Sequence, residues 1–307
     1  MTWLARHTPV LSASLILTAF LGAPALDIVN VELKPATLEA FTRYITATEA
    51  RINREVEHPE GFLHIDELDK TRRAPVFDEL KGGEVFIDRL ETRDAAGHEI
   101  DVPDGLIHHW IGDVFIPGAS MRQVLAFVQD YNHHQDYYAE IVRSRLLSRD
   151  GDDFKIFYRV RKHKVITVTL DTEHDVLYAR LDDAHWSSRS LSTRIAEVVD
   201  AGKSGEHEKP VGHDGGLLWR INSYWRFVER DGGVYIECES VSLTRDIPTG
   251  LGWLIGPFVT SIPKESLEST LSTTRSEVLK RLGHSVLSGS IYYPRPLWGR
   301  GWRASAG

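Results

Sequence analysis

Two adjacent histidine pairs are the first residues in this 307-residue chain that suggest chemistry. They are His108-His109 and His133-His134, and Asp136 follows the second pair closely. Imidazole and carboxylate groups bind zinc, but a zinc site needs three or four of them to converge. Adjacent residues of a strand point to opposite faces, so at most one histidine of each pair can join a given site. Because the sequence has no HExxH or CxxC spacing, we predict no metal and no other cofactor, and interpret the histidines as solvated or capping residues.

Nucleophilic catalysis has equally little support in the sequence. There is no GxSxG motif, and the 14 histidines and many serines can be paired only arbitrarily. Cys238, the only cysteine, lies in a predicted strand, and we interpret it as a small buried apolar side chain. A single thiol cannot form an internal disulfide, so stability must come from the core. The residue types therefore favour a binding protein over an enzyme.

A hairpin over residues 217–245 carries the pattern best suited to binding. Its Asp231-Gly232 pair is a preferred two-residue type I′ turn, and this turn places Arg230 opposite Gly233. One face then alternates large apolar side chains with small hydroxyls, while the other pairs Arg226 with Glu237 and Tyr224 with Glu239. The first of these faces is predicted to hold Trp219, Ile221, Ser223, Trp225, Phe227, Ile236, Cys238, Ser240 and Ser242.

A ligand pocket needs this mixture of apolar area and a few polar groups. Arg194, in a neighbouring predicted strand, is the cation that could meet a carboxylate or phosphate, although such arginines usually form ion pairs on an outer face. The alternative is that the same side chains pack into a solid core. The candidate ligand-binding residues are Trp219, Ser223, Trp225, Phe227, Ile236, Ser240, Arg194 and Leu271.

The elements that must position these residues follow from periodicity and punctuation. Apolar residues at helical spacing predict helices over 36–58, ahead of Gly82-Gly83, after Ser120, and from Pro263 to about Leu282, where Gly283 ends the last one. Residues 201–216 are polar and glycine-rich, which predicts a mobile loop. Strands are predicted over 84–92, 106–116, 140–148, 153–161, 164–171, 175–182 and 186–199, besides the hairpin.

This order of elements over residues 104–284, about three fifths of the chain, resembles the START-like helix-grip superfamily, also called SRPBCC, in particular an exported bacterial branch of it. The superfamily includes birch-pollen-allergen-like and polyketide cyclase-like proteins. The resemblance implies an α+β fold in which a curved antiparallel sheet surrounds a long C-terminal helix and leaves a cavity between them. It also implies that lipids, sterols or polyketide-like molecules occupy the cavity in many members, and that a minority catalyse reactions. The residues that carry the resemblance are Asp104–Pro117, Val124–Tyr138, Asp231–Tyr235, Leu243–Pro248 and the helix from Pro263.

The N-terminus is predicted to be an export signal over residues 1–25. The run Val10–Gly22 has no charge, and Ala23-Pro24-Ala25 offers the small residues that a signal peptidase accepts. The run is about 13 residues long, short of the roughly 20 that span a bilayer as a helix. We expect a soluble product in the periplasm or outside the cell, and an uncleaved anchor is the alternative. Beyond the signal we assign 27–103 to a helical extension with one strand, 104–284 to the helix-grip domain and 285–307 to a flexible tail.

Charge limits the partners of the chain. A net charge of -8 disfavours a broad contact with nucleic acid. The apolar segment 247–258 around Trp253 and the aromatic, arginine-containing tail suggest transient contact with a membrane surface, with a helix over the core and a disordered tail as the respective alternatives.

The predicted function is therefore binding of a hydrophobic, lipid-like molecule in a cavity between the sheet and the C-terminal helix. Two alternatives remain open. One is a cyclase- or hydratase-like enzyme that uses the same cavity, which requires an acid–base pair facing inward. The other is an envelope protein with a structural or interaction role and a filled core, which would show a large apolar patch elsewhere.

Overall fold

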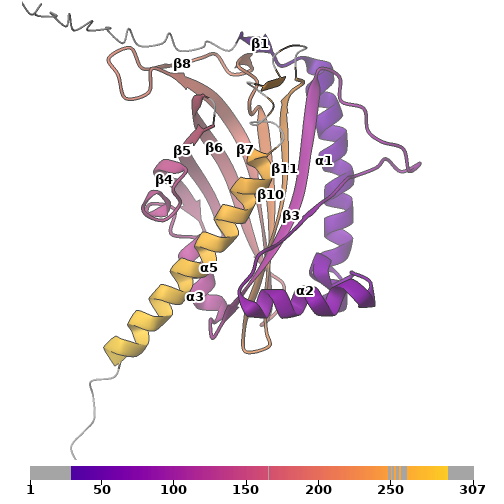
Figure 1. The fold of residues 1–307 in the computed structure, drawn as a ribbon, viewed down its shortest axis with the longest axis vertical. Coiled ribbons are helices and arrows are strands. Elements are labelled where there is room, and N and C mark those ends of the chain that lie inside the picture. Colours follow the sequence, from indigo (N-terminus) through magenta and orange to yellow (C-terminus); the bar gives the residue numbers. More distant parts are fainter. Residues whose placement is uncertain are drawn as a thin grey trace, which may run out of the picture.

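A curved antiparallel sheet dominates the computed structural model, which describes residues 29–164, 166–247, 250, 252–253, 256 and 261–289 (Figure 1). The predicted export signal and the tail from residue 290 lie outside the described residues. The large sheet has nine strands in the order β2-β3-β11-β10-β7-β6-β5-β4, and β8 pairs with β7; β1 and β9 form a separate pair. The strands are β1 (Val31–Glu32), β2 (Phe86–Arg89), β3 (Gly105–Pro117), β4 (Ile141–Asp150), β5 (Asp153–His163), β6 (Thr167–Arg180), β7 (His185–Val199), β8 (His207–Glu208), β9 (His213–Asp214), β10 (Arg220–Arg230) and β11 (Gly233–Arg245).

The helix over Lys70–Gly82 begins and ends at residues suited to those positions. Asp69 accepts hydrogen bonds from the backbone N–H groups of Thr71 and Arg72, and Gly83, at φ +103°, ends the same helix. Among the described residues, no helix combines the length and apolar character needed to cross a membrane. The helices are α1 (Pro35–Val56), η1 (Pro59–Gly61), η2 (His64–Asp66), α2 (Lys70–Gly82), α3 (Met121–Val128), η3 (His134–Asp136) and α5 (Ile262–Gly289).

The hairpin of β10 and β11 has the predicted register along its whole length. Asp231 and Gly232 have φ values of 56° and 74°, as a type I′ turn requires. Arg230 lies opposite Gly233, and Trp225 lies opposite Cys238. Cys238 is buried, as predicted. The turn residues alone were enough to specify which side chains share a face.

Two predicted boundaries were wrong. The strands expected over 164–171 and 175–182 are one strand, β6, because its pairing with β5 continues without a break through the polar residues between them. Helix α5 continues past Gly283 to Gly289. One glycine in a helix costs only about 1 kcal/mol relative to alanine, which is too little to end it.

The polar segment 201–216 is fastened to the sheet rather than being an unattached loop. β8 pairs with the end of β7, and β9 pairs with β1. Lys209 forms an ion pair with Glu197 of β7 at 2.6 Å. A mobile loop was predicted because the segment lacks large apolar side chains. Backbone pairing and one ion pair attach parts of it to β7 and β1.

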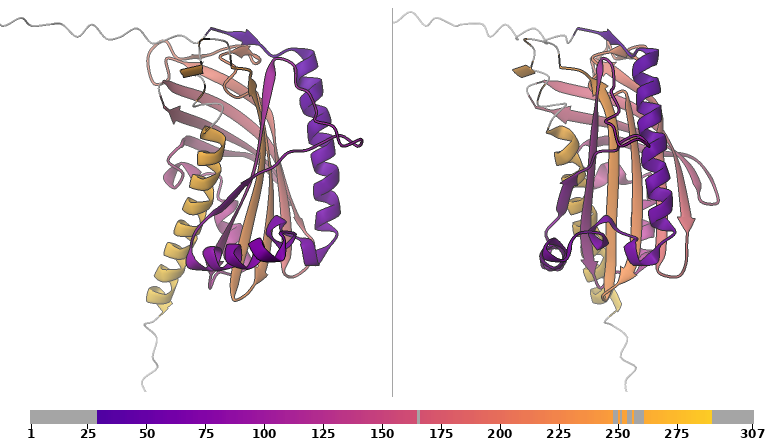
Figure 2. Two further views of the ribbon diagram at one scale, coloured as in Figure 1. Left: turned by 45° about the vertical axis from the view of Figure 1, so that its right-hand side comes forward. Right: turned by 90° about the vertical axis from the view of Figure 1, so that its right-hand side faces the viewer.

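Helices pack against both faces of the sheet (Figure 2). On the face toward α5, the inner face, Leu267, Leu271 and Val278 of the helix pack against the strands. Gly112 of β3 permits this approach, since a Cβ atom there would lie 2.7 Å from Leu271 Cδ1. On the outer face, α1 packs Phe41 against the strands. The predicted α+β helix-grip architecture is confirmed, and the N-terminal extension covers the side opposite the terminal helix.

A buried ionic cluster joins this extension to the outer face. Arg226 pairs with Glu55 of α1 at 2.8 Å and with Glu237 of the neighbouring strand. Arg51 of α1 reaches Glu239 at 2.5 Å. Both predicted cross-strand pairings of the outer face, Arg226 with Glu237 and Tyr224 with Glu239, are present in the register. Because α1 covers them, Arg226, Glu237 and Glu239 lie inside the protein.

Asp113 is the one member of this region without a counter-charge of its own. It is 0% exposed and lies directly opposite Glu237 in the sheet. Among the described residues neither of its carboxyl oxygens receives a hydrogen bond from an N–H group, and its carboxyl can share a proton only with that of Glu237. Burial, and then the charge of Glu237, raise the pKa of Asp113 well above its ordinary value. The folded protein therefore holds a proton on Asp113 under conditions in which the unfolded chain releases it.

Asp113→Asn is expected to stabilise the protein in a pH-dependent way. In the wild type, stability is lost as pH rises from the unfolded pKa, about 4, through the raised folded pKa, because folding then requires either a proton or a buried charge. Asparagine removes that requirement and can donate to Glu237. Denaturant titrations should show equal stabilities near about pH 4 and a gain of roughly 1–3 kcal/mol for the variant at about pH 8. A difference that stays constant across this range would contradict the assignment.

Candidate functional site

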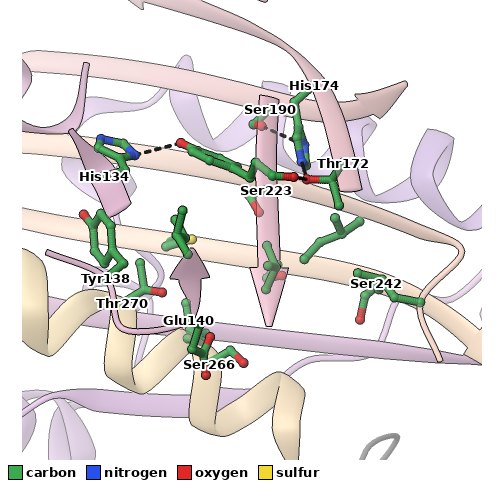
Figure 3. Close-up of a pocket in the computed structure, with 18 of the residues that line it drawn as sticks. His134, Tyr138, Glu140, Thr172, His174, Ser190, Ser223, Ser242, Ser266 and Thr270 are labelled. Carbon is green, nitrogen blue, oxygen red and sulfur yellow. Dashed lines mark hydrogen bonds between the residues drawn. The ribbon is translucent and has the colours of Figure 1, made fainter. Parts of the chain in front are cut away.

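A cavity of about 310 Å³ lies between the inner face and the first turns of α5. Small-molecule sites range over roughly 300–1,000 Å³, and an engineered cavity of about 150 Å³ already holds benzene. Figure 3 shows Ser223 and Ser242 on the sheet side, with Ser266 and Thr270 of α5 across from them. The space is thus large enough for a ligand of modest size.

Small side chains at the centre of the sheet leave this space open. Ser190, Ser223 and Ser240 are direct neighbours across β7, β10 and β11, and we call them the hydroxyl row. Ser242, two residues beyond Ser240, also lines the cavity. Leucines at these positions would fill much of the volume that serine leaves empty. The cavity follows from residue size at particular register positions.

A cluster of aromatic hydroxyls and one imidazole forms the end of the cavity nearest α3. Tyr131 and Tyr178 share a hydrogen bond of 2.8 Å between their hydroxyls, and Tyr158 lies 2.7 Å from Nδ1 of His134. Burial lowers the pKa of His134 to about 4, so the ring is neutral at neutral pH. Tyr138 is bonded to Thr274 of α5 at 2.9 Å. These groups mostly satisfy one another.

A second neutral imidazole stands in the wall. His174 lies 3.0 Å from Oγ1 of Thr172 and 3.5 Å from Oγ of Ser190. Burial lowers the pKa of His174 to about 4. Both lining histidines therefore act as neutral hydrogen-bonding groups. The sequence pattern singled out the His133-His134 pair but carried no sign that His174 belongs to the same cavity.

The charges at the cavity are paired with each other. Among the described lining residues, Glu140 and Lys162 are the only acidic and basic ones apart from histidine. They form an ion pair, and Lys162 also donates to Ser266 of α5. Burial lowers the pKa of Lys162 to about 8. This pair links the β4–β5 side of the sheet to the terminal helix.

Three of the predicted site residues, Ser223, Trp225 and Ser240, line the cavity. Phe227, Ile236 and Leu271 lie in the adjoining core under α5 and are fully buried. Their alternation is as predicted, but the helix packs tightly over them, so they shape the cavity from behind without lining it. Trp225 and Phe227 stack with ring centroids 6.2 Å apart.

Trp219 and Arg194 are corrections, since the structure places both on the outer side. Trp219 precedes β10, outside the regular alternation, and its Nε1 donates to Asp214 at 3.1 Å. Ser190 and Ser192 would place Arg194 inward by alternation, but Thr193 is skipped in the pairing of β7 with β6. This bulge turns Arg194 outward.

The histidines of the adjacent pairs have separate partners. His109 lies on the outer face, 2.9 Å from the hydroxyl of Tyr44 and 2.6 Å from Glu239. His108 bonds Thr244 at 2.9 Å. Within the described parts of the chain, no three His, Cys, Asp or Glu residues are placed to hold a metal ion. Each of these histidines has a structural hydrogen-bond partner.

The described part of the chain combines this strand order with a long helix across the inner face and a cavity between helix and sheet. The chain has a helix-grip fold. This confirms the architecture that the START-like resemblance implied. The helix-grip domain carries the cavity, while residues of the N-terminal extension cover its back.

Several solved structures are distantly similar to this chain. A STAR-related lipid transfer protein from Xanthomonas axonopodis is 17% identical, with 58% of this chain and 96% of that chain covered and a TM-score of 0.41. The Zhui aromatase/cyclase from a Streptomyces species is 13% identical, with 58% and 96% covered and a TM-score of 0.39. Human STARD10 is 8% identical, with 71% and 86% covered and a TM-score of 0.40. No family model and no curated protein matches the sequence. Because these structural similarities are distant, we assign the fold from the strand order and α5.

Proposed function

We propose that this protein reversibly binds an apolar small molecule in the cavity between the inner face and α5. The observation that carries the proposal is the composition of the wall: aliphatic and aromatic side chains with a few hydroxyls, in a space of about 310 Å³. A ligand that buries roughly 200 Å² of apolar surface would gain about 5 kcal/mol from desolvation. Trp225, backed by Phe227, supplies the largest flat surface. The alternative with a filled core does not fit a cavity of this size.

We propose that this binding takes place outside the cytoplasm. The support is the uncharged run and small residues of the predicted signal over 1–25. Trp253 is 63% exposed, a property suited to transient contact with a membrane surface, which we include in the proposal. Analysis of cell fractions with an antibody against the mature chain would test the location.

A second candidate is a cyclase- or hydratase-like reaction in the same cavity, and Lys162 is the observation that favours it. Its lowered pKa of about 8 is close to the value that suits acid–base work. However, Lys162 is paired with Glu140, and His134 is too weakly basic to accept a proton at neutral pH. Binding without turnover is therefore the better-supported function.

Trp225→Ala is expected to weaken retention of any co-purifying hydrophobe at least tenfold, because the variant loses the main aromatic wall. Native mass spectrometry of the purified mature protein measures the bound fraction and identifies the ligand. Leu177→Ala is the control, since Leu177 is exposed on the outer face and should leave the load unchanged. An unchanged load in Trp225→Ala would count against the cavity as the binding site.

A further inference from the structure

We infer that the cavity prefers a neutral ligand whose hydrogen-bonding oxygen lies inside the molecule, between two apolar arms, over a ligand with a charged or terminal head group. This inference rests on the proposed function and concerns the chemical class of the ligand. It follows from where the cavity has charge, where it has hydroxyls, and what lies on either side of those hydroxyls.

The first step is the absence of a cation available to an anionic ligand. Lys162 is the only lysine or arginine among the described lining residues, and it is already held by Glu140 and Ser266. Arg194, the predicted head-group residue, pairs with Glu208 on the outer face. The lining histidines His134 and His174 are neutral at neutral pH. A carboxylate or phosphate drawn into the cavity would lose its hydration without gaining a counter-charge, which is strongly unfavourable.

The second step is a set of hydroxyls that lack partners in the protein. Ser242 is 4% exposed, lines the cavity and has no hydrogen-bond partner among the described residues. Ser223 and Ser240 likewise have none within the described part of the chain, whereas Tyr131, Tyr178 and Thr172 bond to each other or to His174. A serine hydroxyl both donates and accepts, so an alcohol or a carbonyl oxygen can satisfy it. Leaving such a group buried and unpaired is costly.

The third step is the position of these hydroxyls along the strands. On the inner face of β10, Ser223 stands between Ile221 and Trp225, and the distance from Ile221 to Trp225 is about 13 Å along the strand. Beyond Ile221, the cavity wall continues with Leu170 and Leu217. Apolar surface therefore lies on both sides of the polar centre. A ligand with its oxygen at one end would leave either the hydroxyls unpaired or one apolar wall uncovered.

Four probes with the same number of carbon atoms distinguish an internal oxygen from a terminal, charged or absent one. They are undecane, undecyl alcohol, dipentyl carbinol and undecanoate. Calorimetry on the full-length mature protein should show dipentyl carbinol binding roughly three- to tenfold more tightly than its isomer undecyl alcohol, the ratio expected for one or two additional hydrogen bonds. Undecanoate should bind at least tenfold more weakly than dipentyl carbinol. The isomeric alcohols have the same functional group and similar hydration, so their ratio reports the position of the oxygen.

The combined variant Ser223→Ala, Ser240→Ala and Ser242→Ala keeps the shape of the cavity and removes these three sheet hydroxyls. It should abolish the preference between the two alcohols and bind undecane at least as tightly as the wild type, because the hydrocarbon then buries no unpaired hydroxyl. Ser148→Ala, on the exposed edge strand β4, is the matched control and should retain the wild-type ratio. Equal affinity for the two alcohols, or tightest binding of undecanoate, would overturn the inference and leave the proposed function standing. Failure of all four probes to bind would instead refute the proposed function.

Discussion

Replacing Arg226 with alanine is expected to destabilise the protein by roughly 3–5 kcal/mol. Arg226 is 2% exposed and serves three carboxylates, Glu55 at 2.8 Å, Glu237 and Glu239 at 3.8 Å, besides the carbonyl of Phe62 at 2.9 Å. Alanine would leave Glu237 buried without a cation, while Arg51 still pairs with Glu55 and Glu239. The loss is large because the charge of Glu237 is then uncompensated, and it does not measure the net worth of the ion pairs.

Chemical denaturation of the purified variant measures this loss. Arg194→Ala is the control, because Arg194 forms surface ion pairs with Glu208 and Glu173 that are worth no more than about 1 kcal/mol. An Arg226→Ala loss similar to that of the control would show that the outer-face cluster is solvated. Ligand affinity of the remaining folded protein should be unchanged, since Arg226 faces away from the cavity.

Ser223→Leu is expected to reduce binding of the hydrophobic ligand at least tenfold. Leucine at this central position would extend into the space between the sheet and α5 that the ligand requires. Because the added methylenes enter an existing cavity, they should not strain the core as they would in a filled one, and each buried methylene can contribute up to about 0.8 kcal/mol. Binding assays and denaturant titrations on the same preparation therefore give opposite results: weaker binding with unchanged or increased stability.

Ser148→Leu is the matched control for this variant, since Ser148 is exposed on β4. It should leave both binding and stability close to those of the wild type. Full binding by Ser223→Leu would place the ligand elsewhere. Together, Arg226→Ala and Ser223→Leu separate the two faces of the sheet: the outer face affects stability through a buried ionic cluster, while the inner face affects ligand binding.

Local chemistry was enough to predict a large part of this molecule. The Asp231-Gly232 turn, with positive φ at both residues, determined every pair in the β10–β11 hairpin and the burial of Cys238. Apolar residues at helical spacing predicted α1 and the apolar face of α5 that packs on the sheet. An amphipathic helix turns its apolar face toward the core, so the spacing of apolar residues shows which face is buried. The order of these elements resembles that of the START-like superfamily, and this resemblance implied the α+β helix-grip class.

The membership of the site was only partly predictable. Alternation identified Ser223, Trp225 and Ser240 as cavity-facing candidates, and they line the cavity. It could not identify His134 and His174, because only the folded sheet brings Tyr158 of β5 against both of them. The variants above test the predicted role of Ser223, Trp225 and Ser240 as ligand contacts.

The tertiary structure decided the features that depend on contacts between segments distant in the sequence. A bulge at Thr193 reversed the direction of Arg194, and a bulge shifts every later side chain although its own sequence carries no clear signal. The docking of α1 buried Arg226 and Glu237, which from the hairpin pattern alone would be solvated. Turn type and periodicity are set by neighbours along the chain, so sequence determines them directly. Burial, pKa and the size of a cavity depend on what packs against a residue from elsewhere, and only the folded structure brings those groups together.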